Sequence, residues 1–84
     1  MNYRIIVKPK AQKDLDKLQT KEVKKIATRI TQLSSNPRPI GVQKLSDDEG
    51  HRLRIGNYRV LFVVDDKAKS ILIYRIKHRK DAYK

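Results

Sequence analysis

The sequence predicts an α+β fold in the order β-α-α-β-β-β, with a helical hairpin packed on one face of a mainly antiparallel sheet. Three observations predict it: apolar residues at helical spacing in the first half, strand-like apolar runs in the second, and short turn signals between those runs. Because 84 residues can bury one modest core but not two, we expect residues 1–84 to form a single domain.

The first half reads as one strand followed by two helices. Residues 2–8 are rich in β-branched side chains, and Pro9 suits the first turn of a helix, where its missing N–H needs no partner. Thr20 is the expected N-cap of the second helix, and the cluster Ser34–Pro39 ends it. The apolar stripes of the two helices are formed by Ala11, Leu15 and Leu18, and by Val23, Ile26, Ala27, Ile30 and Leu33.

The second half reads as strands joined by tight connections. Gln43–Leu45 is a possible short strand, and Ser70–Ile76 is a longer one. Between them, Gly56-Asn57 is a two-residue hairpin signal that joins strands at His51–Ile55 and Tyr58–Val64. Strand alternation directs one set of side chains toward the helices: Leu53, Ile55, Tyr58, Val60, Phe62 and Val64.

The charge balance is strongly positive. Lysine and arginine number 21 against 9 acidic residues, a formal net charge of +12. Self-repulsion of this size indicates an acidic partner such as nucleic acid, membrane or an acidic protein. The apolar runs fall far short of the ~20 residues that span a bilayer, and the start of the chain reads as a strand, not a signal peptide. The absence of cysteine excludes disulfides and thiolate metal sites. We expect a cytoplasmic protein with no membrane association, metal or cofactor.

Arginines are concentrated in the second half of the chain. Three precede Gly50 and five follow it, and the planar guanidinium matches the geometry of phosphate. With Gly56-Asn57 as the turn, Arg54 lies opposite Arg59, and alternation puts Arg52 on the same side. Two opposed arginines repel, so either they splay into water or an anion lies between them. No acidic residue of the hairpin shares this face, which favours the anion.

The basic C-terminal segment carries a second group of candidates, His78, Arg79 and Tyr83. These side chains matter for function only if the segment folds back beside the arginines, because chain ends usually fray. His78 is the one nearby group whose ordinary pKa lies near ~6.5. The strand alternation leaves open whether it points toward the core instead.

Two segments resemble the RelE family of toxins, which belong to toxin–antitoxin pairs. They are His51-Arg-Leu-Arg-Ile-Gly-Asn-Tyr-Arg-Val60 and, after a strand rich in Ile, Leu and Tyr, His78-Arg-Lys-Asp-Ala-Tyr83. The resemblance extends over essentially the whole chain. Its Gly-Asn-Tyr-Arg sequence is shared across the RelE/ParE superfamily and indicates the fold, whereas the His-Arg…Tyr ending is more particular to the RNA-cleaving branch.

The resemblance implies a ribosome-dependent mRNA endonuclease that cuts transcripts in the A site of the 70S ribosome and is inhibited by a cognate acidic antitoxin. It implies that Arg59 and Arg79 contact the scissile phosphate and that Tyr83 stacks on or helps activate the cleaved nucleotide. The full set of candidates is Arg54, Arg59, Arg79, Tyr83 and His78 for catalysis, and Arg52, Arg75, Lys77 and Lys80 for substrate binding. Some family members carry lysine at positions 52 and 54, where arginine cannot move a proton.

The candidate residues meet only part of the chemical requirement. In metal-free RNA cleavage the 2′-OH attacks the adjacent phosphate, which requires a proton acceptor, a proton donor and positive charge around the transition state. Arginines supply the charge, but no clear His/His or Glu/His pair supplies the proton transfers. We therefore expect activity to depend on alignment of the RNA by the ribosome. Two alternatives remain open: a ParE-like inhibitor of DNA gyrase, and an RNA-binding module without catalysis.

Overall fold

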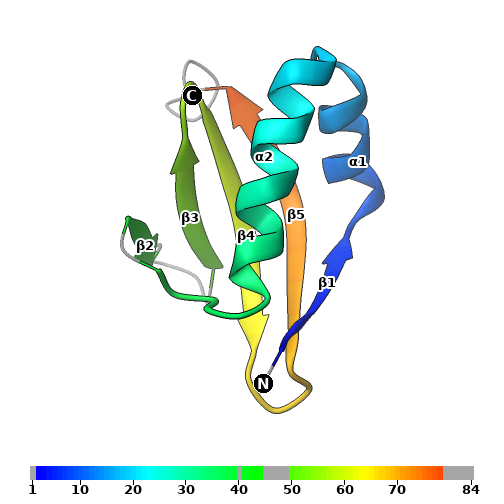
Figure 1. Ribbon diagram of the computed structural model, residues 1–84. Helices are drawn as coiled ribbons and strands as arrows, with labels where there is room; N and C mark the ends of the chain where they lie inside the picture. The colour runs from blue at the N-terminus through cyan, green and yellow to red at the C-terminus, as the bar shows by residue number, and fades with distance from the viewer. Residues whose placement is uncertain (1, 40, 45–49, 79–84) are drawn as a thin grey trace.

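The computed structural model describes residues 2–39, 41–44 and 50–78, and within them two helices cover one face of a five-stranded sheet (Figure 1). The predicted fold class is confirmed. The possible short strand is present, so the order becomes β-α-α-β-β-β-β. The elements are β1 (Arg4–Val7), α1 (Pro9–Asp16), α2 (Thr20–Leu33), β2 (Val42–Lys44), β3 (Gly50–Ile55), β4 (Tyr58–Asp65) and β5 (Ser70–His78).

The sheet has the order β1-β5-β4-β3-β2. The last four strands of the chain pair antiparallel as consecutive neighbours, whereas β1 pairs parallel with β5. The first and last strands are therefore adjacent, and the helical hairpin is the connection that carries the chain from one edge of the sheet toward the other. None of the helices among the described residues is long and apolar enough to cross a membrane.

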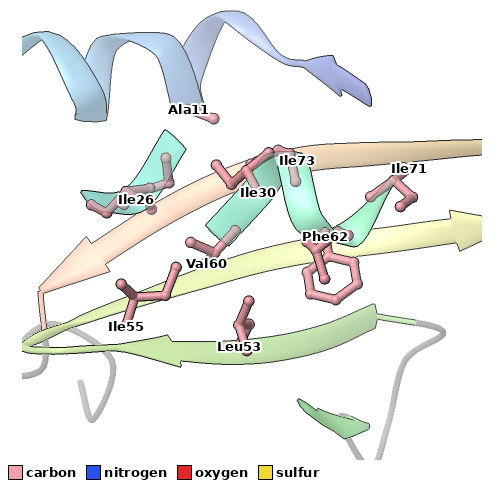
Figure 2. Packing of buried hydrophobic residues seen from close by; sticks show 11 residues of the cluster. Ala11, Ile26, Ile30, Leu53, Ile55, Val60, Phe62, Ile71 and Ile73 are labelled. Carbon is pink, nitrogen blue, oxygen red and sulfur yellow. The ribbon is translucent and has the colours of Figure 1, made fainter. Parts of the chain in front are cut away.

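The core lies between the helices and one face of the sheet (Figure 2). Ile26 and Leu33 from α2 are fully buried against Val60 and Phe62 from the central strand β4. Ala11 extends the same layer from α1. The predicted alternation in the hairpin is confirmed, because the side chains on the helix side are buried or packed on the core while Arg54 is exposed.

Two local predictions were wrong in detail. Thr20 is the first residue of α2, and the N-cap is Gln19, whose backbone is extended and whose side chain makes no capping hydrogen bond. The reason is the tight connection, in which the Leu18 N–H bonds the carbonyl of Leu15, so that Gln19 must redirect the chain. The last strand also continues two residues beyond the predicted end, to His78.

A β-bulge in β5 changes which of its side chains face the core. Phe62 pairs with Ile73, but its neighbour Leu61 pairs with Arg75, so Tyr74 is the extra residue on β5. Ile73 and Ile76 are consequently both buried, although they are three positions apart. Such a bulge re-aims side chains at the edge of a sheet.

The outer edge of β5 is protected by α1. β1 ends at Val7, and the last backbone bond from that segment runs from the Lys8 N–H to the Ile73 carbonyl at 2.9 Å. Beyond it, Asp14 Oδ2 accepts hydrogen bonds from the Ile76 N–H and from Arg75 Nε, both at 2.9 Å. Burial alone would raise the pKa of Asp14, but these two hydrogen bonds outweigh burial and lower the pKa.

Replacing Asp14 by alanine is expected to destabilise the protein by about 1–3 kcal/mol, because the Ile76 N–H loses its acceptor at a partly buried edge. Urea unfolding measures this. Asp16→Ala removes an exposed carboxylate from the same helix and should cost less than ~0.5 kcal/mol. Because folding lowers the pKa of Asp14, its contribution is present at neutral pH and is lost as pH falls below the ordinary carboxyl pKa of ~3.9. Equal destabilisation by the two variants would contradict this role.

Candidate functional site

The arginines of the hairpin lie on the face of the sheet opposite the helices. The register pairs Arg54 with Arg59, as the two-residue turn predicts, and Gly56 in that turn has a φ of +59°. The row continues onto β5, where Lys77 pairs with Arg59. Three positive side chains thus follow one another across three adjacent strands.

A pocket of about 210 Å³ opens beside this row. We call it the arginine pocket, and it is lined by Gly41, Gln43, Arg52, Arg54 and Arg59. Gln43 pairs with Arg52 across β2 and β3, and its Oε1 accepts a hydrogen bond from Arg52 Nη2. Sequence reasoning missed Gly41 and Gln43, because the pairing register of so short a strand is set by tertiary contacts.

The guanidinium groups of the pocket differ in exposure. Arg54 is exposed, Arg52 is half-buried, and Arg59 is only 4% exposed although it lies on the helix-free face. Arginine keeps its charge at any physiological pH, and burial reduces the screening of that charge by water. The positive electrostatic potentials of the three guanidinium groups therefore add inside the pocket. The chemical group that fits this pocket is an anion with several oxygens, such as a phosphate.

Both histidines lie on the helix side of the sheet. His51 pairs with Phe62 and stacks on its ring with the centroids 5.5 Å apart. Burial, followed by the nearby positive charges of Arg38 and Lys44, lowers the pKa of His51, which is therefore neutral at pH 7. His78 pairs with Tyr58, and the two rings meet edge-on with their centroids 5.3 Å apart. The structure therefore does not bring His78 to the arginine pocket, because alternation on β5 gives that face to Lys77.

The remaining candidates divide into two groups. Arg75 forms an ion pair with Asp14 at the outer edge of β5 and does not line the arginine pocket. Arg79, Lys80 and Tyr83 lie outside the described residues. Within residues 2–39, 41–44 and 50–78, no group of three His, Asp or Glu side chains is placed to hold a metal ion.

Solved structures share this fold. A chain of the toxin–antitoxin complex RelBE2 from Mycobacterium tuberculosis superposes with a TM-score of 0.84 at 26% identity, covering 94% of this chain and 93% of that one. A chain of the RelE–RelB complex from Pyrococcus horikoshii superposes with a TM-score of 0.81 at 27% identity, covering 94% and 97%.

Sequence comparisons agree with the structural ones. The chain is 34% identical to the protein named "Putative toxin RelE1" of Methanocaldococcus jannaschii, over all of this chain and 98% of that protein. Residues 5–83 match the family described as the ParE toxin of type II toxin–antitoxin systems, parDE. These similarities define the class of the protein, a type II toxin with the RelE/ParE fold. The chain belongs to the ParE toxin family of those systems.

If an anion normally balances the opposed arginines, Arg54→Gln should have two effects. It should raise stability by up to ~1 kcal/mol at low ionic strength, because it removes a cross-strand repulsion. It should also weaken the stabilisation of the protein by phosphate, which acts by binding the folded state. Thermal unfolding with phosphate or with chloride at matched ionic strength measures both effects.

Arg4→Gln is the matched control, because it removes the same charge from an exposed position on β1, outside the arginine pocket. This variant should respond to phosphate as the wild type does. An unchanged phosphate response in Arg54→Gln would show that the pocket is not an anion site.

Proposed function

We propose that this toxin is an endoribonuclease that cuts mRNA in the A site of the 70S ribosome and so inhibits translation in the cytoplasm. The observation that carries the proposal is the pocket in which Arg52, Arg54 and Arg59 converge on the helix-free face. Its size and charge suit a phosphodiester, and the sheet that holds it is fixed on the other face by the packed helices.

The proposed reaction is attack of a 2′-OH on the adjacent phosphate, with no metal ion. The 2′-OH gives up its proton and its oxygen bonds to phosphorus as the bond between phosphorus and the 5′-oxygen breaks. The 5′-oxygen takes up a proton, and the products are a 2′,3′-cyclic phosphate and a 5′-hydroxyl. Arg54 and Arg59 stabilise the extra negative charge on the non-bridging oxygens, because their positions are set by the strands before the substrate arrives. Arg52 and Lys77 hold the neighbouring backbone.

The C-terminal segment completes the proposal. Arg79 supplies another cation at the scissile phosphate, and Tyr83 stacks on the nucleotide or assists proton transfer. Arg54 cannot take part in proton transfer, because a guanidinium does not lose its proton in proteins. His78 lies on the helix side of the sheet, where its ring contacts Tyr58, and we assign it no contact with the RNA. The ribosome then supplies the alignment that the protein's own groups do not.

An antitoxin is the expected inhibitor. The matched structure from Mycobacterium tuberculosis is the toxin–antitoxin complex RelBE2, and the one from Pyrococcus horikoshii is a RelE–RelB complex. With a net charge of +12, this chain would associate readily with an acidic antitoxin through electrostatic attraction.

A second candidate function is inhibition of DNA gyrase. The observation that favours it is the match of residues 5–83 to the ParE toxin family. In that case the arginine pocket would not act on RNA, and the purified protein would block supercoiling without cutting message. The similarity to a RelE toxin over the whole chain favours the nuclease.

Primer extension on translated message should separate these functions. Induction of the wild type is expected to produce new transcript ends, and Arg59→Ala and Arg79→Ala should each reduce cleavage by more than about tenfold because each removes charge stabilisation from the transition state. Tyr83→Phe should reduce cleavage if the hydroxyl assists proton transfer. The same message without ribosomes should be cut far more slowly.

Arg4→Ala is the control for loss of a positive charge, since Arg4 is exposed and lies outside the arginine pocket. It should cleave as the wild type does. Growth arrest that persists in all three site variants without any new transcript ends would replace the nuclease with the gyrase inhibitor.

A further inference from the structure

A second and larger cavity, of about 410 Å³, opens at the outer edge of β5. It is lined by Lys8, Pro9, Lys10, Tyr74 and Arg75. Two irregularities create it at the same level of the sheet. On one side the chain leaves β1 after the Lys8 N–H bonds Ile73, and on the other the bulge inserts Tyr74.

The walls of this cavity combine positive charge with flat apolar surface. Lys8 and Lys10 are exposed, and Arg75 is held in place by Asp14 on the neighbouring helix. Tyr74 lies on β5 and is half-buried, so part of its side chain is open to solvent. An aromatic ring beside lysines is the combination that binds a nucleotide, with the base on the ring and the phosphate on the ammonium groups.

The cavity lies two strands away from the arginine pocket across the sheet. Arg75 pairs with Leu61, and Leu61 pairs with Arg52, which lines the arginine pocket. Adjacent strands lie roughly 4.8 Å apart, so β5 and β3 are separated by about 10 Å. A short stretch of single-stranded RNA spans such a distance, and Lys77 is placed between the two sites on the row of Arg59.

We propose that the cavity at Tyr74 is a nucleotide subsite that holds RNA flanking the phosphate bound in the arginine pocket. The base of one nucleotide stacks on Tyr74, and its phosphate is bound by Lys8 and Lys10. This subsite rests on the RNA-directed function proposed above and specifies how the protein grips its substrate beyond the cleaved bond. An acidic peptide would use the lysines as well, but it would gain little from the aromatic ring.

The test is binding of a short, 2′-O-methylated single-stranded RNA, which cannot be cleaved by 2′-OH attack, measured by fluorescence anisotropy. Tyr74→Ala should weaken binding by about fivefold or more through loss of base stacking, and Tyr74→Phe should restore it. Lys8→Gln combined with Lys10→Gln should weaken binding and make the dependence of log affinity on log salt shallower by about 1.4, the value expected for two lost contacts to single-stranded phosphate.

The matched control is Lys21→Gln combined with Lys67→Gln, which removes the same charge from exposed positions on α2 and on the turn before β5. It should bind RNA as the wild type does, and thermal unfolding should show all variants folded. A polyglutamate peptide is the second probe. If Tyr74→Ala leaves RNA affinity unchanged while the cavity lysine pair weakens the peptide and the RNA equally, the subsite is a general acidic contact and the proposal fails.

The two proposals fail separately. If RNA binding depends on Tyr74 but the wild type produces no new transcript ends, the subsite proposal stands and the nuclease proposal fails. If the Tyr74→Ala variant cleaves message normally and binds RNA with unchanged affinity, the nuclease proposal stands and the subsite proposal fails.

Discussion

The proposed anion site depends on two positive side chains that face each other across one hairpin. A two-residue turn fixes the hairpin register, and that register places Arg54 directly opposite Arg59. A sheet stabilised only by its own contacts would avoid this pair, because like charges on facing positions repel. The pair is tolerated because the other face of the same strands is buried among apolar side chains, with Val60 and Phe62 fully enclosed. The packing energy of one face thus holds an electrostatically unfavourable arrangement on the other.

The division of the sheet into two faces explains how so small a chain can combine a core with the arginine pocket. Both helices lie on one face, so the opposite face remains available for the arginine pocket (Figure 1). Two features shape the edge of β5. The bulge at Tyr74 shifts which side chains of the strand face the core, and the Asp14 carboxylate accepts a hydrogen bond from the Ile76 N–H. The helices packed on the other face fix the strands that carry Arg54 and Arg59, and charges positioned in advance would stabilise the proposed transition state without reorganisation.

Sequence reasoning was most successful where the local signal is strong. The Gly56-Asn57 turn and the alternation around it predict the pairing of Arg54 with Arg59, and the spacing from Val23 to Leu33 predicts the longer helix. Sequence patterns do not predict features that tertiary contacts determine. The register of β2 brings Gln43 to Arg52 without a local sequence signal, and the bulge at Tyr74 has none either. His78 could not be assigned to a face until the bulge and the length of β5 were known.

An NMR titration of the arginine Nε–Hε resonances with a dinucleotide phosphodiester tests most directly whether the arginine pocket binds a phosphate group. We expect the resonances of Arg52, Arg54 and Arg59 to shift together along one binding curve, while that of Arg38, which is paired with Asp66, remains in place. Shifts spread evenly over all arginines, or no shift at Arg54 and Arg59, would contradict this expectation.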